Sequence, residues 1–301
     1  MIVNTITQCN RIFSAKTPNP LVSVIRLSDS KEVPDLLQFG FYTIWLKQWK
    51  ADTPSCFGKK NCDFCDNTLV PLRPGTSIHR ELLECNISKS EGILLCFHTS
   101  IFNPCRIEEC AHDYSFFRYR TDESLHLSFR EQQIIEREIF SIEEELYWGI
   151  DEHSYTILAE RIKLLLDYIT RFYKRQFILR HDDNMEMVNE TEALLSEFFY
   201  SGKAQNLPLP TLENLAEQFD VSPVYLNDLL KYETGKDFEN YINYKRISIA
   251  ENLLKNKDRN VQEVAAILGF PTDNEFCILF KRLGGNSPGS VTSNHELKRL
   301  N

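Results

Sequence analysis

The sequence of 301 residues lacks long hydrophobic runs, and no apolar stretch approaches the roughly 18–20 residues that a membrane-spanning helix needs. Its start also lacks the basic residues followed by an apolar stretch that mark a secretory signal peptide. We therefore expect a cytoplasmic protein with no membrane partner, in which thiols are normally reduced. With 42% hydrophobic and 26% charged residues, the composition is that of a globular chain long enough for two domains.

An excess of positive charge is also absent. The formal net charge is −9, and the segment 207–301 alone contains 11 Lys and Arg against 13 Asp and Glu. Proteins that bind nucleic acids usually carry a basic face. The charge balance therefore argues mildly against nucleic-acid binding, although a basic stripe on one surface is compatible with an acidic total.

The residue patterns of common active sites are missing as well. The seven histidines include no closely spaced pair of the kind that holds a catalytic metal. The sequence has neither a glycine-rich phosphate loop nor a nucleophile elbow. Cys96 and His98 occupy alternate positions of an apolar run, which fits a buried strand better than a nucleophile and its base. We therefore expect neither an enzyme nor a bound cofactor.

Cysteine, by contrast, is plentiful: there are nine, of which eight precede residue 111. Cys56, Cys62 and Cys65 lie in the run CFGKKNCDFC, a spacing that could supply thiolate ligands to zinc. A tetrahedral zinc site needs a fourth ligand, for which Cys85 or His79 would be required. Structural zinc sites more often use two C-x2-C pairs, so ordinary turn cysteines are the favoured interpretation and no metal is expected.

Short apolar runs broken by turn residues dominate residues 1–128. Phe41–Trp49, Thr68–Gly75 and Gly92–His98 have the length and composition of strands. Pro71, Pro74 and Gly75 place a turn directly after Leu69–Val70. Several such strands in about a hundred residues indicate a small antiparallel barrel or sandwich.

The period changes to three and four residues between 129 and 206. Ile135, Ile139 and Ile142 belong to one apolar stripe, and Leu158, Ile162 and Leu165 belong to another. We expect two paired amphipathic helices, whose apolar faces serve either intramolecular packing or a homodimer. A third helix is expected over Met185–Tyr200, followed by a linker over Ser201–Pro210.

The segment 207–301 is helical with clear boundaries. Thr211 and the pair Ser222–Pro223 provide helix N-caps and a first-turn proline, and Gly235 provides a C-terminal glycine. A long helix is expected over Phe238–Leu254, and Asn260 with Glu263 forms a capping box before the next helix. The order predicts two helix–turn–helix units joined by one helix, which can present two recognition helices to major grooves about 34 Å apart.

The C-terminal segment resembles the double helix–turn–helix domain of AraC/XylS-type transcription regulators over nearly all of residues 209–290. The landmarks that match in order are Leu215–Ala216, Ser222–Pro223, Tyr225–Leu226, Lys231, Glu233–Thr234–Gly235–Lys236, Phe238, Tyr241, Arg246, Ala250, Leu253–Leu254, Val264–Ala265, Gly269–Phe270, Phe276, Phe280–Lys281, Gly285 and Pro288. The first two hundred residues resemble, more loosely, the cupin-like sensor half of such regulators. The resemblance implies a sensor half that binds an effector or mediates dimerisation, and a half that binds promoter DNA and contacts RNA polymerase.

The recognition helices depart from the family pattern by losing donors and cations. Asp228 stands where the family commonly has Arg or another donor, and Asn274-Glu275-Phe276 followed by Ile278 replaces Ser-Tyr-Phe and a basic residue. Gly289-Ser290-Val291 replaces the Tyr-Arg that follows Ser-Pro. Because phosphate neutralisation supplies much of the affinity for DNA, two interpretations stay open: weaker or differently targeted DNA binding, or ordinary binding through other residues.

The remaining polar residues receive expected roles, against the alternative that each simply covers a solvated helix face. The candidates for reading bases are Ser222, Val224, Tyr225, Asn227, Asp228 and Asn274, and the candidates for phosphate contacts are Lys231, Lys236, Lys245, Lys281 and Arg282.

The prediction is thus an α+β protein with a cupin-like antiparallel β-barrel over 1–128, a helical linker over 129–206 and an all-α DNA-binding domain over 207–301. The leading hypothesis is a transcription regulator that binds promoter DNA and responds to an unknown effector. One alternative is an interaction or sensor protein with a weak DNA-binding face. Another is a zinc-thiolate or redox sensor acting through Cys56, Cys62 and Cys65.

Overall fold

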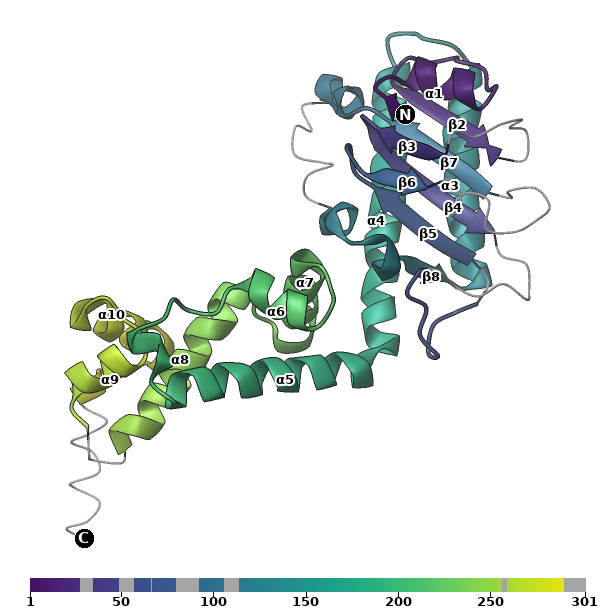
Figure 1. The fold of residues 1–301 in the computed structure, drawn as a ribbon. Coiled ribbons are helices and arrows are strands. Elements are labelled where there is room, and N and C mark those ends of the chain that lie inside the picture. Colours follow the sequence, from purple (N-terminus) through teal and green to yellow (C-terminus); the bar gives the residue numbers. More distant parts are fainter. Residues whose placement is uncertain are drawn as a thin grey trace. The chain divides into compact units, whose positions relative to one another are not determined.

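The computed structural model describes residues 1–27, 35–48, 57–65, 67–79, 92–105, 114–255 and 259–289. The chain forms two compact units, Met1–Arg180 and His181–Asn301. The first combines a sheet structure with helices and the second is helical, so the expected α+β class is confirmed (Figure 1). None of the helices in these described ranges has the length and apolarity to cross a membrane.

Among its described residues, the first unit has two sheets and three α-helices. Its elements are β1 (Ile2–Val3), α1 (Ile6–Ile12), β2 (Val22–Arg26), β3 (Leu36–Phe39), β4 (Tyr42–Gln48), β5 (Asn67–Leu72), β6 (Ser77–His79), β7 (Gly92–Phe97), β8 (Leu125–Leu127), α3 (Phe129–Tyr147) and α4 (Ser154–Leu179), with three short 3₁₀ helices (Thr99–Cys105, Ser115–Arg118 and Thr121–Glu123) between β7 and β8. The three strands expected from the apolar runs correspond to β4, β5 and β7. The turn expected directly after Val70 was wrong, because β5 continues through Pro71 to Leu72 in register with β4.

The strands that the structure describes pair in two separate sheets, and these strands do not close into one barrel. A five-stranded antiparallel sheet has the order β2-β7-β4-β5-β8, and a three-stranded sheet has the order β1-β3-β6. In the smaller sheet β1 and β3 run parallel, while β3 and β6 run antiparallel. The expected antiparallel sheet structure is therefore present, and the described strands divide it between these two sheets.

The larger sheet is buried on both faces, which explains why its strands read as nearly continuous apolar runs. Ile44, Leu46 and Leu95 pack on one face with the buried stripes of α3 and α4, while Trp45 and Leu94 pack on the opposite face with α1 and the small sheet. Figure 1 shows α3 and α4 covering the sheet. The stripes predicted for these helices thus serve intramolecular packing.

Over residues 181–255 and 259–289, the second unit has six α-helices and one 3₁₀ helix. They are α5 (His181–Tyr200), the 3₁₀ helix Lys203–Gln205, α6 (Leu212–Gln218), α7 (Pro223–Thr234), α8 (Phe238–Lys255), α9 (Val261–Ile267) and α10 (Asp273–Gly284). The helix α5 begins at His181, earlier than the expected Met185. It lies with the C-terminal helices in one compact unit, while α3 and α4 lie with the sheets. The expected division into a sensor domain (1–128), a helical linker (129–206) and a DNA-binding domain (207–301) stays a prediction about function.

Candidate nucleic-acid interface

The first helix–turn–helix consists of α6, a short turn and α7. Thr211 and Ser222 cap the two helices as expected: each side chain accepts a hydrogen bond from a backbone N–H of the first turn. The turn is closed by Val221 N–H donating to the Ala216 carbonyl and passes through Asp220 with a φ of +52°. Gly235, with a φ of +72°, ends α7 in the left-handed conformation expected for this glycine.

The second helix–turn–helix repeats the same construction with α9 and α10. Asn260 and Glu263 form the expected capping box, and the N-cap of α10 is Thr272. Gly269, with a φ of +72°, takes the place that Asp220 has in the first turn, and Phe270 N–H donates to the Ala265 carbonyl. Two copies of one local geometry are therefore present in this unit.

The connecting helix α8 contacts the second helix–turn–helix through Arg246. This guanidinium is buried, donates from Nε to the Leu268 carbonyl at 3.1 Å and stacks on the Phe270 ring at 3.6 Å. Burial lowers the pKa of Arg246 to about 10, an effect partly opposed by the negative charge of Glu275. Arg246 therefore supports the turn between α9 and α10 rather than offering its charge to solvent.

Two of the candidate base readers on α7 have structural roles. Tyr225 is 4% exposed and packs in the core, while Ser222 is 6% exposed and caps the helix. Asn227 is half-buried, and its Oδ1 accepts a hydrogen bond from the Phe238 backbone N–H at 2.9 Å. Val224 and Asp228 are half-buried. Base contact by any of these residues stays a prediction, and the geometry favours Val224 and Asp228 over Ser222 and Tyr225.

The N-terminal turn of α10 is exposed and acidic. Asp273, Asn274 and Glu275 are all exposed, whereas Phe276 and Phe280 are fully buried and in ring contact with centroids 5.5 Å apart. Carboxylates stabilise a helix N-terminus through its dipole, but they repel phosphate. Asn274, expected to read bases, therefore stands between two exposed acidic residues in the first turn of α10.

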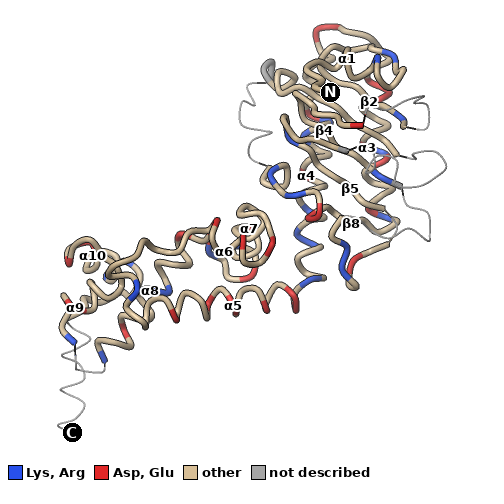
Figure 2. Tube along the Cα trace, in the orientation of Figure 1, with Lys and Arg blue, Asp and Glu red and all other residues tan. Residues whose placement is uncertain are grey.

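The five cations expected to contact phosphate fall into two groups. Lys231, Lys281 and Arg282 are exposed, and within the described part of the chain their side chains have no ion pair. Lys245 forms an ion pair with Glu192 of α5, and the Lys236 ammonium lies 4.6 Å from the centroid of the Tyr244 ring. Figure 2 shows basic and acidic positions interspersed along these helices. Three cations are thus available to DNA without first losing a partner.

Sequence reasoning missed the part that α5 plays in this unit. The side chain of Glu233, near the end of α7, is only 5% exposed. Its Oε1 accepts a hydrogen bond from Asn184 Nδ2, and its Oε2 lies 3.0 Å from His181 Nδ1. Tyr244, half exposed beside Lys236, was missed as well. A buried glutamate next to a glycine C-cap carries no local signal in the sequence, because its partners come from a helix about fifty residues away.

The candidate metal ligands are only partly visible. Cys56 and Cys85 lie outside the described residues, and His79 ends β6. Among the residues that are described, no group of three His, Cys, Asp or Glu side chains is arranged to hold a metal ion. Cys62 and Cys65 lie together in one exposed turn.

Comparison with known proteins finds matches to the C-terminal segment. A family model described as a helix-turn-helix domain matches residues 215–294. The uncharacterized HTH-type transcriptional regulator YijO of Escherichia coli strain K12 is 40% identical over 78 residues, which cover 26% of this chain and 28% of that protein. The HTH-type transcriptional activator RhaS of Salmonella arizonae is 31% identical over 120 residues, which cover 40% of this chain and 43% of that protein.

Among solved structures, the C-terminal domain of AraT, a response regulator from Geobacillus stearothermophilus, is 29% identical, covers 36% of this chain and 84% of that chain, and has a TM-score of 0.31. The match to each of the two curated relatives above covers less than half of that protein's length. The matched segment coincides with the two repeated helix–turn–helix units and their connecting helix. The C-terminal unit of this chain is thus similar to helix-turn-helix domains, including those of the HTH-type proteins YijO and RhaS.

Proposed function

We propose that the chain is a cytoplasmic transcription regulator that binds promoter DNA through both helix–turn–helix units. The observation that carries the proposal is the repetition of one capped helix–turn–helix geometry on either side of α8, within the segment that matches a helix-turn-helix domain. Of the two curated relatives described above, one is named as a transcriptional regulator and the other as a transcriptional activator. Contact with RNA polymerase is part of the proposal, by resemblance to the family.

A cavity in the first unit supports the proposed response to an effector. Its volume is about 710 Å³, and it lies between the residues that follow α1, strand β2 and the end of α3. Phe13, Val24 and Leu146 give it an apolar surface, while Arg26 and Glu143, which also line it, form an ion pair at 2.6 Å. A cavity with mostly apolar walls and a few polar groups is typical of small-molecule sites. The effector is accordingly a small molecule with an apolar body.

Exposed apolar side chains support the proposed homodimer. The stripes that face the sheet are occupied, but Phe140 of α3 is 52% exposed and Leu164 of α4 is 45% exposed. A second copy of the chain is the proposed occupant of the exposed sides of α3 and α4, since large exposed apolar residues on paired helices favour helix association.

A second candidate function is an interaction or sensor protein whose DNA-binding face is weak. One observation favours it: the exposed N-terminal turn of α10 carries Asp273 and Glu275, where an approaching phosphate would meet negative charge. The two candidates differ in how affinity for DNA depends on salt.

A salt series on the full chain separates them. Binding to a set of promoter fragments is measured by fluorescence anisotropy while the salt concentration is raised. Three available cations predict a slope of about −3 for the logarithm of the association constant against the logarithm of salt concentration. Absence of binding even at the lowest salt would sink the transcription-regulator proposal and leave the interaction protein.

A further inference from the structure

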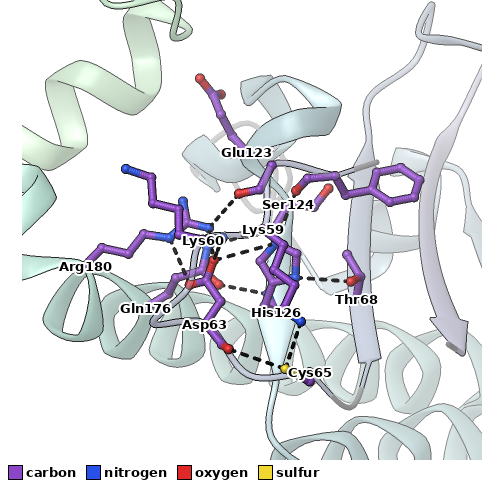
Figure 3. A network of polar contacts seen from close by, with 12 residues as sticks. Lys59, Lys60, Asp63, Cys65, Thr68, Glu123, Ser124, His126, Gln176 and Arg180 are labelled. Carbon is purple, nitrogen blue, oxygen red and sulfur yellow. Dashed lines mark hydrogen bonds and ion pairs between the residues drawn. The ribbon is translucent and has the colours of Figure 1, made fainter. Parts of the chain in front are cut away.

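The segment 57–65, which we call the cysteine loop, is seated on the first unit by a set of buried polar contacts (Figure 3). His126 Nε2 lies 3.2 Å from the Phe57 carbonyl, and His126 Nδ1 lies 3.2 Å from the Thr68 hydroxyl. Gly58 has a φ of +64°, and a Cβ atom there would lie 1.6 Å from the Asp122 carbonyl oxygen. The backbone of the loop therefore packs closely against its neighbours.

Asp63 is the main anchor of the cysteine loop. Arg180, which directly follows α4, donates to both carboxylate oxygens of Asp63, from Nε at 2.9 Å and from an Nη at 2.5 Å. Burial alone would raise the pKa of Asp63, but the hydrogen bonds and charge of Arg180 outweigh it and hold this pKa below its ordinary value. Asp63 and Arg180 are 5% and 3% exposed, so the pair is desolvated and sensitive to small displacements.

The two cysteines of the loop flank this anchor. Cys62 and Cys65 are exposed, whereas Asp63 between them points inward to Arg180. Lys59 Nζ donates to Cys65 Sγ at 2.8 Å. Reactive cysteines are found in exposed positions beside cationic groups and in C-x2-C motifs, and Cys65 meets all of these conditions.

Other thiols of the first unit have different surroundings. Cys9 of α1 and Cys96 of β7 are fully buried in the core between the sheets. A shared hydrogen bond with Cys96, together with burial, raises the pKa of Cys9 far above its ordinary value. Buried thiols of this kind are inert. The cysteine loop is therefore distinguished by exposure and by Lys59, and not merely by containing cysteine.

We propose that Cys65 and Cys62 are a peroxide-sensitive dithiol that closes to a disulfide in the cysteine loop. The Cys65 thiolate attacks a hydroperoxide, so that an S–O bond forms, the O–O bond breaks, and the departing hydroxide takes up a proton to become water. The sulfur of Cys62 then attacks the Cys65 sulfur, an S–S bond forms, the S–O bond breaks, and a second water leaves. Two thiols and hydrogen peroxide give one disulfide and two waters.

Closing this disulfide changes the backbone that holds Asp63. The i to i+3 link constrains the turn on both sides of the carboxylate, whose two hydrogen bonds to Arg180 tolerate little displacement. The end of α4 therefore becomes less protected when the disulfide forms. Because the chain continues from Arg180 directly into His181 and the DNA-binding unit, oxidation is expected to change DNA affinity; only this last step rests on the proposed function.

The experiment treats the reduced full chain with hydrogen peroxide and follows each cysteine by peptide mass spectrometry. Cleavage after Lys60 places Cys62 and Cys65 in one peptide, which should lose the mass of two hydrogen atoms on oxidation. Hydrogen exchange in the last turns of α4 should rise in the same sample. Formation of the disulfide without this rise would overturn the coupling to Arg180.

Matched variants test each role. In Cys62→Ser the oxidation should stop at a sulfenic acid on Cys65, and in Cys65→Ser the fast reaction should be lost. Lys59→Gln should slow the reaction about fivefold, whereas Cys277→Ser, which changes a half-buried thiol of α10, should leave the rate unchanged. Oxidation of Cys62 and Cys65 no faster than that of Cys277, or a disulfide from either of them to Cys56, would overturn the proposal. These mass measurements need no DNA, so they stand even where the salt series fails.

Discussion

His126 is the residue at which pH acts most directly on the first unit. Its side chain is 1% exposed, and burial lowers its pKa to about 4 from the ordinary 6.5, with the charges of Asp63 and Arg180 pulling in opposite directions. The Phe57 carbonyl can only accept, so His126 Nε2 carries the proton and the neutral ring accepts from the Thr68 hydroxyl at Nδ1. The folded unit thus requires an uncharged imidazole.

We predict that the first unit loses stability as pH falls from about 6.5 to about 4. In this window the unfolded chain binds a proton at His126 that the folded chain does not, so stability is complete above the unfolded pKa and declines below it. The loss should reach about 3 kcal/mol at the lower end. Urea unfolding followed by tryptophan fluorescence measures it, because Trp45 lies in the core of this unit.

Two variants bracket this pH effect. His126→Gln removes the titrating group and should flatten the decline between pH 6.5 and 4, leaving the loss at lower pH that follows from the lowered pKa of Asp63. His153→Gln changes a histidine that is 74% exposed and should keep the decline of the unmodified protein. An equally steep decline in His126→Gln would assign the effect to other groups.

Single residues were predictable where the signal is local. Ser222, Asn260 with Glu263 and Gly235 were expected at helix ends and occupy them, since a cap needs only its own turn. Tyr225 was expected to face DNA and is buried instead. Which side of a helix is covered depends on neighbouring helices, and these are set by packing far from the residue in sequence.

At the scale of elements, the two turn glycines provide a matched comparison. Gly235 and Gly269 both have a φ of +72°, which L side chains rarely adopt. A Cβ atom at Gly235 would meet nothing within 4 Å, whereas at Gly269 it would lie 2.9 Å from the Ala204 carbonyl oxygen and 3.1 Å from the Ala204 Cβ. The same backbone strain is therefore combined with open space in one turn and with close packing in the other.

We predict that Gly235→Ala destabilises the second unit by about 1 kcal/mol, through strain alone. Gly269→Ala should destabilise it by about 1–3 kcal/mol more, since the neighbouring segment must shift. Hydrogen exchange of the most protected amides of α8, which contacts both helix–turn–helix units, gives the free energy of opening for each variant. Equal costs would show that the contact with Ala204 contributes nothing.

Long periodic elements were predicted better than short ones. The helices α3 and α4 and the strands β4, β5 and β7 follow from their apolar patterns. The two-residue strand β1 and the three-residue strand β6 are too short to show a period, and their pairing with β3 joins residues far apart in the sequence. The expected linker 201–210 likewise contains a 3₁₀ helix, whose Ala204 is buried beside Gly269.

At the scale of the whole molecule, the order of family-like residues along the chain predicted the C-terminal domain. The loss of cations from the second recognition helix predicted the exposed acidic turn at the start of α10. The order of strands in the two sheets was beyond sequence reasoning, because sheet pairing is a choice among many nonlocal partners. The choice between strong and weak DNA binding depends on how the acids of α10 act against Lys231, Lys281 and Arg282, which is a sum of opposing charges.

We predict that Asp273→Asn combined with Glu275→Gln raises the affinity of the full chain for promoter fragments about tenfold at low salt, because two repulsive charges leave the phosphate-facing turn. Asn and Gln keep the helix start, since Gln still suits the third position of a capped helix. Glu144→Gln combined with Glu160→Gln removes the same charge from exposed positions of α3 and α4 and serves as the control. Fluorescence anisotropy titrations should show the gain only in the α10 variant. Equal gains in both would assign the effect to net charge, and a lower affinity in the α10 variant would show that Asp273 or Glu275 itself contacts a base.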